Sequence, residues 1–214
     1  MIISNPIGRS KIFISFFLVF LSNLLYSQDK VKFWKGCYYT KAGYQINGFL
    51  AFKPNARRIV LYAPNEHAQP ERIKARRLSG FVIDKDSFAI ISDFFVEGVY
   101  QDRIWARKPD VAKVLEVGSV NLYLCHYIES TTEMIGHSSN STFHRRDYSI
   151  IPVYVLRRKD SPLLQSVPES QASFNKVMSK YFEDDPNLAE EIANGKYANR
   201  TTPELVRRFN NNTQ

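Results

Sequence analysis

The feature that most constrains this fold is a long segment, from Lys35 to about Arg158, in which short apolar runs alternate with turn-forming residues. Several runs alternate apolar and polar residues, the period expected of a strand with one buried face. Gly43 lies between two such runs and supplies the positive φ that a short hairpin turn requires. Tight turns between successive strands favour an antiparallel sheet over parallel βαβ units, so we expect roughly eight to ten short strands.

The apolar runs place most of these strands. Residues 129–147 are polar and show no period, so we expect a long loop there. Pro152 favours an edge position or a bulge in the strand that follows. The expected strands span residues 37–40, 46–52, 58–62, 72–83 (one alternating stretch ending in a hairpin), 87–91, 94–99, 103–107, 111–117, 119–128 and 148–157.

The chain changes to a helical pattern after Pro162. Residues 170–183 carry apolar side chains at helical spacing. Asp185-Pro186 and Thr202-Pro203 each resemble an N-cap followed by proline at the first helical position, which predicts two further helices. The predicted class is therefore α+β, mainly β, with an antiparallel domain over 28–160 and two or three helices packed on it over 161–214.

Residues 1–27 have the order of a secretory signal peptide. Two basic residues precede an apolar run, residues 12–25, and cleavage is expected between Ser27 and Gln28. This run is shorter than the roughly 20 apolar residues that a membrane-spanning helix needs. We therefore expect export to the periplasm or beyond, with no stable membrane span after cleavage. An uncleaved signal-anchor is the alternative.

The mature chain is basic. The full chain has a formal net charge of +8, and loss of Arg9 and Lys11 leaves 27 basic and 21 acidic residues, a net charge of +6. Such a surface favours anionic material of the cell envelope, such as lipid headgroups or acidic glycans. Nucleic acid is the usual partner for this balance, but export argues against it. The simpler alternative is that these charges only keep the surface soluble.

The two cysteines, Cys37 and Cys125, allow one disulfide in an exported protein. Closing so long a loop could stabilise the fold by up to ~4 kcal/mol. Each cysteine also lies in an apolar, strand-like run, where a reduced and buried thiol is common. The sequence leaves both alternatives open.

Three of the four histidines lie in or beside the polar segment 129–147. Their spacing matches neither HExxH nor a short-spaced zinc finger, and the serines there lack a GxSxG elbow. We therefore assign no catalytic residue, no metal ligand and no cofactor. An envelope hydrolase remains the alternative function, and the residues that it would use are His126, His137, His144, Glu129 and Glu133.

One group of basic residues could bind an anion. Arg72, Lys74 and Arg76 alternate within an expected strand, which would align them in one row. A solvated sheet face explains the same pattern, so this anion-binding strip is the less conservative interpretation.

Several segments together carry a resemblance to known proteins. After the signal peptide they are KGCYYTKAGYQINGFLAF, SGFVIDKDSFAIIS, KVLEVGSVNLYLCHY, FNKVMSKYFEDDPNLAEEIANGKY and ELVRRFN. The chain resembles a family of exported Gram-negative bacterial proteins of unknown function. The resemblance implies an exported protein with this architecture, and no catalytic residue.

The sequence thus predicts a non-enzymatic envelope or secreted module that binds a partner. The expected partner is an envelope protein, a glycan or an anionic lipid surface. A groove between the sheet and the helices, or the segment 129–147, is the expected contact site.

Overall fold

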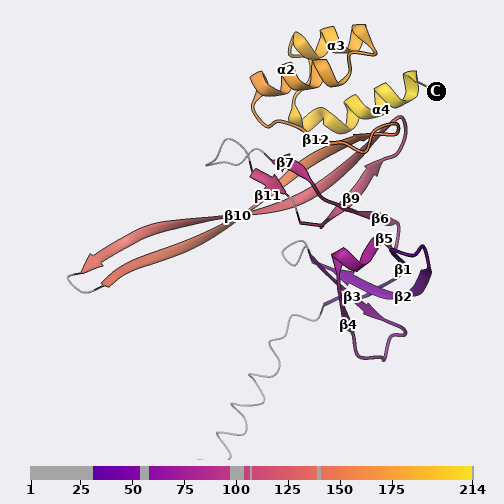
Figure 1. Ribbon diagram of the computed structural model, residues 1–214, viewed down its shortest axis with the longest axis vertical. Helices are drawn as coiled ribbons and strands as arrows, with labels where there is room; N and C mark the ends of the chain where they lie inside the picture. Colours follow the sequence, from indigo (N-terminus) through magenta and orange to yellow (C-terminus); the bar gives the residue numbers. More distant parts are fainter. Residues whose placement is uncertain (1–30, 54–57, 97–103, 107, 139–140, 214) are drawn as a thin grey trace, which may run out of the picture. The chain divides into compact units, whose positions relative to one another are not determined.

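A computed structural model describes residues 31–53, 58–96, 104–106, 108–138 and 141–213 (Figure 1). For residues 104–105, 129–138 and 141–148 only the backbone is described. The chain divides into two units, residues 1–32 and 33–214, and every described helix and strand belongs to the second.

Ten of the described strands form one sheet, in the order β12-β11-β10-β9-β6-β5-β1-β2-β3-β4, and all of its pairs are antiparallel. The fold class predicted from the sequence is therefore confirmed. In chain order the strands of this sheet are β1 (Trp34–Thr40), β2 (Gln45–Phe52), β3 (Ile59–Ala63), β4 (Glu71–Lys74), β5 (Leu78–Ile83), β6 (Asp86–Ile91), β9 (Asp110–Glu116), β10 (Val120–Ser138), β11 (Ser141–Arg158) and β12 (Leu164–Ser166). A separate two-stranded sheet consists of β7 (Phe94–Val96) and β8 (Ile104–Ala106).

Local turn chemistry explains the first hairpins. Gly43 has φ +86° in the turn between β1 and β2, a conformation that glycine adopts without a steric penalty. Asp84 has φ 53° in the turn between β5 and β6, in the left-handed region that aspartate tolerates better than most residues. The expected strand 72–83 is interrupted by a 3-10 helix, Ala75–Arg77, which separates β4 from β5.

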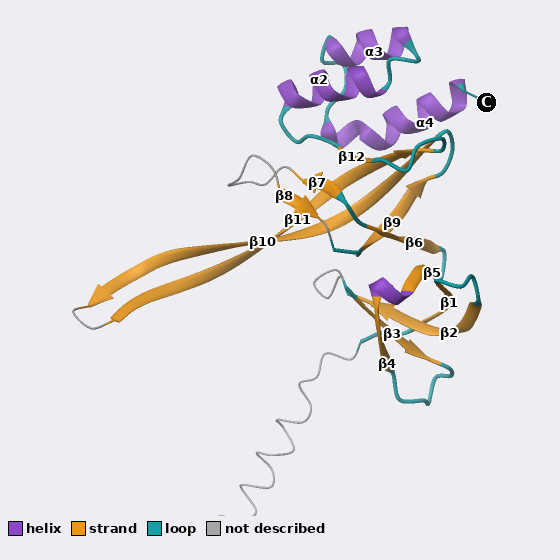
Figure 2. Ribbon diagram, in the orientation of Figure 1, coloured by secondary structure: helices purple, strands orange, loops and turns teal. Residues whose placement is uncertain are grey.

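The long loop expected over residues 129–147 is wrong, because these residues continue β10 and β11 (Figure 2). The two strands pair from Val120↔Arg158 to Ser138↔Ser141, with a register shift between Met134 and Gly136. β9 pairs with β10 only as far as Cys125. Beyond that point the described strands form a two-stranded ribbon that no third described strand joins. Apolar and polar residues therefore need not alternate along it.

The C-terminal helices begin at or within one residue of the predicted positions. They are α2 (Gln171–Tyr181), α3 (Pro186–Ala193) and α4 (Thr202–Asn212). The Ser170 hydroxyl accepts a hydrogen bond from the Ser173 N–H, and the Asp185 carboxylate accepts one from the Leu188 N–H at 3.0 Å. The third helix begins one residue earlier than the pattern indicates, with Thr201 at its N-cap. No helix in the described part of the chain combines the length and apolarity that a membrane span requires.

The strands beneath the helices bury both faces. Leu122 and Leu156 belong to a core that they share with the C-terminal helical region, including Phe174, Phe182 and Phe209. Their neighbours along β10 and β11 pack on the other face with β7, in a second core around Phe94, Val96, Tyr123, Cys125 and Val155. A third core is formed mainly by β1–β6 with Val111 of β9, around Phe81, whose ring stacks on Phe88 with 4.6 Å between the ring centroids. The helices and the strands beneath them are therefore held together by one continuous apolar layer.

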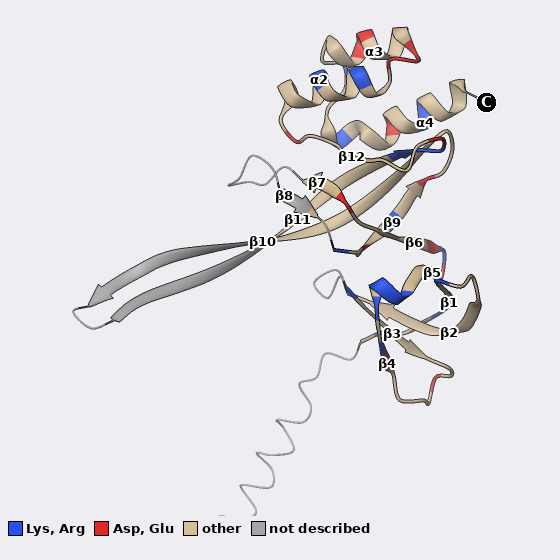
Figure 3. Ribbon diagram, in the orientation of Figure 1, with Lys and Arg blue, Asp and Glu red and all other residues tan. Residues whose placement is uncertain are grey.

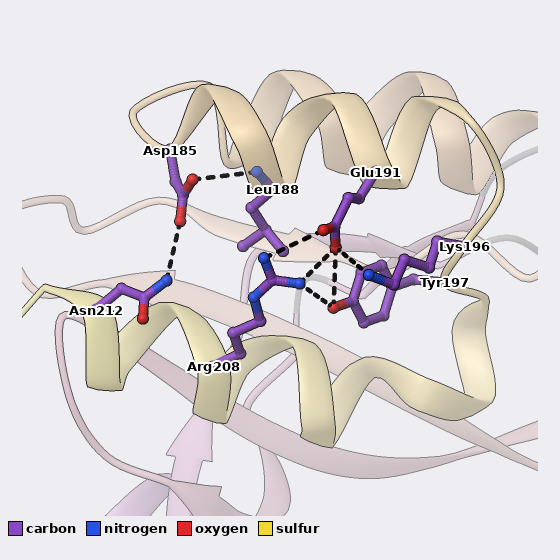
Figure 4. A network of polar contacts seen from close by, with 7 residues as sticks. All are labelled: Asp185, Leu188, Glu191, Lys196, Tyr197, Arg208 and Asn212. Carbon is purple, nitrogen blue, oxygen red and sulfur yellow. Dashed lines mark hydrogen bonds and ion pairs between the residues drawn. The ribbon is translucent and has the colours of Figure 1, made fainter.

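A polar network joins α3 to α4 and to the segment between them (Figure 4). Arg208 on α4 donates hydrogen bonds to the Glu191 carboxylate and to the Tyr197 hydroxyl, the latter at 2.7 Å. Lys196 forms an ion pair with the same carboxylate at 2.9 Å. Hydrogen bonds from Arg208 and then from Lys196 lower the pKa of Glu191 to about 2.

This network predicts a pH dependence of stability. Because the folded state lowers the Glu191 pKa below its unfolded value near 4.5, the contribution is complete above pH 4.5 and is lost as pH falls towards 2. Glu191→Gln should therefore lower the melting temperature near pH 7, and the difference from the wild type should shrink between pH 4.5 and 2. Thermal unfolding followed by circular dichroism across this range measures the difference, and a pH-independent difference would contradict the assignment.

Candidate functional site

The basic residues singled out in the sequence lie at one edge of the sheet. Arg72 and Lys74 belong to β4, the last strand in the order, and both are exposed. Arg76 is exposed too, but it belongs to the 3-10 helix and does not continue the strand. Figure 3 shows basic positions in blue along β4. The strip therefore contains two strand residues and one turn residue.

The residues of the expected hydrolytic site are spread along the ribbon. His126 lies opposite Pro152, whereas His144 lies opposite Met134, eight residues further along β10. At the usual strand rise this separation is about 27 Å. The side chains of Glu129, Glu133, His137 and His144 lie outside the described residues. The described side chains contain no group of three metal-binding residues.

The two cysteines are buried, and they do not form a disulfide. Cys37 lies on β1 and Cys125 on β10, and three strands, β5, β6 and β9, lie between them in the sheet. Neighbouring strands are about 4.8 Å apart. A disulfide requires Cα atoms within about 7 Å, so the bridge that the sequence allows is not formed in this fold.

A groove runs along the opposite edge of the sheet, at β12. It has a volume of about 810 Å³, within the range of small ligand sites. Its walls come from β12, from α2 on one face of the sheet and from β7 on the other. We call it the edge groove, and its principal apolar and basic lining residues are Phe95, Leu163, Leu164, Lys176, Val177 and Lys180.

Only one residue of β12 turns its backbone groups to this groove. The Val167 N–H donates to the Tyr154 carbonyl of β11 at 2.8 Å, so Val167 faces β11. Because hydrogen-bonding direction alternates along an antiparallel strand, Leu164 and Ser166 direct their backbone groups away from β11. Ser166 is buried, is not part of the groove lining, and its carbonyl accepts a hydrogen bond from the Gln165 side chain, so Leu164 is the residue whose backbone faces the groove. No described strand pairs with β12 on this side.

Two apolar side chains at the groove are unusually exposed. Leu163 is 77% exposed and Phe95 is 47% exposed. Both line the groove, together with Val177 of α2. Isolated exposed apolar residues are ordinary, but their convergence on one groove indicates a surface that another molecule covers.

The groove is lined by charges of both signs. Lys176 and Lys180 lie one turn apart on α2, both are exposed, and neither has a carboxylate partner among the described residues. Four carboxylates line it as well, those of Asp93, Asp160, Glu183 and Asp184, and Asp184 is paired with Arg158. A bound molecule would therefore meet both positive and negative charge.

Arg158 is the last residue of β11 and contacts two other residues that line the groove. Its guanidinium donates to Asp184 at 2.5 Å and to the Tyr181 backbone carbonyl, and it lies 5.1 Å from the centroid of the Tyr181 ring. Burial raises the pKa of Tyr181 to about 12, so the hydroxyl stays protonated at neutral pH. The Tyr181 hydroxyl oxygen is buried, and no described residue forms a hydrogen bond with it.

Sequence reasoning expected a groove between the sheet and the helices, but it did not identify these residues. Leu163 and Leu164 lie between Pro162 and Pro168, outside every expected strand and helix. This apolar pair in a connecting segment is the signal that could have marked them. Comparison of the chain with protein-family models, with curated proteins and with solved structures finds no match.

Proposed function

We propose that this chain is an exported, non-enzymatic binding module that holds a partner of the cell envelope in its edge groove. The observation that carries the proposal is the convergence of exposed apolar side chains and of lysines without a carboxylate partner on one groove of the described part of the chain. Its lining contains no histidine or cysteine among the described residues, and its serine, Ser161, accepts a hydrogen bond from the Leu163 N–H. Such a surface is suited to recognition. The export half of the proposal rests on the signal-like residues 1–27.

Site-specific photocrosslinking tests this proposal. A photoreactive phenylalanine analogue is placed at Leu163 in the full chain, expressed in the native host, and the envelope fraction is irradiated. Val117 is the matched control, because it is 76% exposed, against 77% for Leu163, and lies outside the groove. We expect a discrete crosslinked species from position 163 that position 117 does not give.

Two results would contradict the proposal. One is the same pattern of crosslinks from both positions, which would mean random encounter. The other is recovery of the protein in the cytoplasmic fraction with residues 1–27 still attached, which would reject the envelope as its location.

A further inference from the structure

We infer that one face of strands β1–β4 binds the surface of an anionic lipid membrane. This face points away from the core around Phe81, and we call it the basic face. Its principal residues are Lys35, Phe49, Ile59, Leu61, Arg72 and Lys74. None of them lines the edge groove, so the inference concerns a second surface and does not rest on the proposed function.

Strand pairing places these six residues on one face. Residues directly opposite each other in antiparallel strands share a face, and so do alternate residues along one strand. The pairs on this face are Arg72↔Leu61, Lys74↔Ile59, Ala63↔Phe49 and Phe49↔Lys35. The intervening residues Leu50, Val60 and Ile73 pack into the core around Phe81, so the basic face is the other side of the sheet.

The apolar residues of the basic face pack into none of the described cores. Phe49, Ile59 and Leu61 are half-buried, and none of them belongs to or packs against the three apolar cores formed by described residues. Exposed basic residues flank them, Lys35 on β1 and Arg72 with Lys74 on β4. Apolar groups between basic ones suit a membrane interface, where apolar side chains enter the headgroup region and lysine and arginine reach the phosphates.

Within β1–β4 no carboxylate lies on the basic face. Glu71 is the one acidic residue of these four strands, and it lies opposite Tyr62, which packs against the core on the other side. Lys35, Arg72 and Lys74 form no ion pair with any residue that the structure describes. Their charges are therefore available to an anionic partner.

The positive charge of the mature chain is concentrated in this part of the molecule. Residues 31–83 contain ten basic and two acidic residues, a net charge of +8, whereas the whole mature chain has a net charge of +6. In Figure 3 blue positions predominate around β4 and the 3-10 helix. Each lysine or arginine close to an anionic membrane strengthens binding by about fivefold. This asymmetry would orient the basic face towards such a membrane.

The same residues favour a lipid surface over two other occupants. A second copy of this chain would bring like charges together across the contact, which disfavours association. An acidic glycan matches the lysines and arginines but offers no apolar phase to Phe49, Ile59 and Leu61. An anionic membrane offers both phosphate groups and an apolar boundary.

Vesicle binding by the purified mature chain tests the inference. The probes are vesicles of phosphatidylethanolamine with phosphatidylglycerol, and the comparison is with vesicles of phosphatidylcholine alone. Cosedimentation measures the partition coefficient. At about 0.05 M NaCl it should be at least about tenfold higher for the anionic vesicles, and this difference should be lost at about 0.5 M NaCl, where salt screens the charges.

Hydrogen exchange of the unmodified protein locates the contact without any variant. β4 is the last strand of the described sheet, so a peptide covering residues 71–77 contains backbone N–H groups at the sheet edge. Anionic vesicles should slow exchange in this peptide by about twofold or more. A peptide covering residues 162–167, at the opposite end of the strand order, is the control and should be unchanged.

Charge removal tests the role of the basic residues. Lys35→Gln, Arg72→Gln and Lys74→Gln combined should lower the partition coefficient for anionic vesicles by at least about tenfold. The matched control removes the same charge from three exposed residues of the C-terminal region, by Lys159→Gln, Lys180→Gln and Arg200→Gln. The control should stay within about threefold of the wild type, because these residues lie outside the basic face.

Several results would overturn the inference. Equal partitioning into anionic and neutral vesicles, or into neither, would reject an anionic lipid as the ligand. An equal loss in both triple variants would mean that binding follows the net charge and not this face. Binding to soluble alginate without binding to anionic vesicles would assign the face to an acidic glycan. None of these results bears on the crosslinks from residue 163, which test the edge groove alone.

Discussion

Replacing Gly36 with alanine is expected to lower the free energy of unfolding by at least about 3 kcal/mol. A β-carbon at this position would lie 2.0 Å from the Val82 carbonyl oxygen of the paired strand β5. The oxygen belongs to the backbone, so it cannot move away without disrupting the pairing of β1 with β5. Gly36 also pairs with Gly48 in β2, where a β-carbon would lie 2.5 Å from the Tyr62 ring. The close approach on both sides explains why two glycines face each other in the interior of this sheet.

Gly43→Ala is the comparison for this measurement. A β-carbon added to Gly43 would have no heavy atom within 4 Å beyond the neighbouring residues, but the φ of +86° disfavours alanine. Its expected cost is about 1 kcal/mol, from backbone strain alone. Urea unfolding followed by far-ultraviolet circular dichroism gives both values. A loss for Gly36→Ala no greater than that for Gly43→Ala would show that β1 and β5 are not packed this closely.

The second large effect is expected at Asn210 of α4. Its side chain accepts a hydrogen bond from the Val120 N–H and donates one to the Val120 carbonyl, both at 2.9 Å. The amide thus takes the place of a neighbouring strand at the start of β10. Asn210 is 6% exposed, and alanine would leave both backbone groups without their partner. An unsatisfied buried group costs about 1–3 kcal/mol, so Asn210→Ala should lower the free energy of unfolding by about 3 kcal/mol.

Asn211→Ala is the control, because Asn211 is exposed on the same helix. Its expected effect is within about 0.5 kcal/mol of zero. Asn210→Asp adds a second test, because aspartate keeps the acceptor but loses the donor and buries a charge. Urea titrations of the three variants should place Asn210→Asp close to Asn210→Ala. Equal stability of the alanine variants at 210 and 211 would show that α4 does not depend on this amide.

Local patterns predicted the helices with little error. The expected helix 170–183 corresponds to α2, Gln171–Tyr181, and Asp185 caps α3 as its spacing indicates. Both predictions succeed because the apolar stripe of a helix and the hydrogen bond of its N-cap each depend on residues three or four positions apart. The strands from β1 to β6 follow from alternation for a similar reason, since a strand with one buried face repeats every two residues.

The ribbon shows where this reasoning fails. Residues 129–147 lack alternation, and alternation was the criterion for a strand. Past Cys125 the described part of β10 pairs only with β11, so no third strand and no second layer of strands demands an apolar face. Once β10 and β11 are paired in register, their mutual backbone hydrogen bonds are sufficient to continue both strands. This pairing leaves no pattern of apolar residues in the sequence.

The sequence predicted the position of the groove, at the boundary between the sheet and the helices, but not the residues that line it. Its residues could not be chosen because the sequence does not say which strand ends the sheet. β12 has only three residues, Leu164–Ser166, and a segment this short carries no measurable period. Phe95 and Lys180 reach the same groove from positions 85 residues apart in the chain, and that meeting depends on how all the layers pack.

The amino-acid sequence by itself therefore determined the antiparallel, mainly β class, the order of most of the secondary structure and the capped C-terminal helices, because each depends on residues close in the chain. Only the tertiary structure decided the order of strands across the sheet. That order separates Cys37 from Cys125, gives Asn210 its strand-like role at Val120 and places β12 at the end of the sheet. Strand order depends on pairing between distant segments, and many orders share the same local pattern of apolar residues, turns and caps.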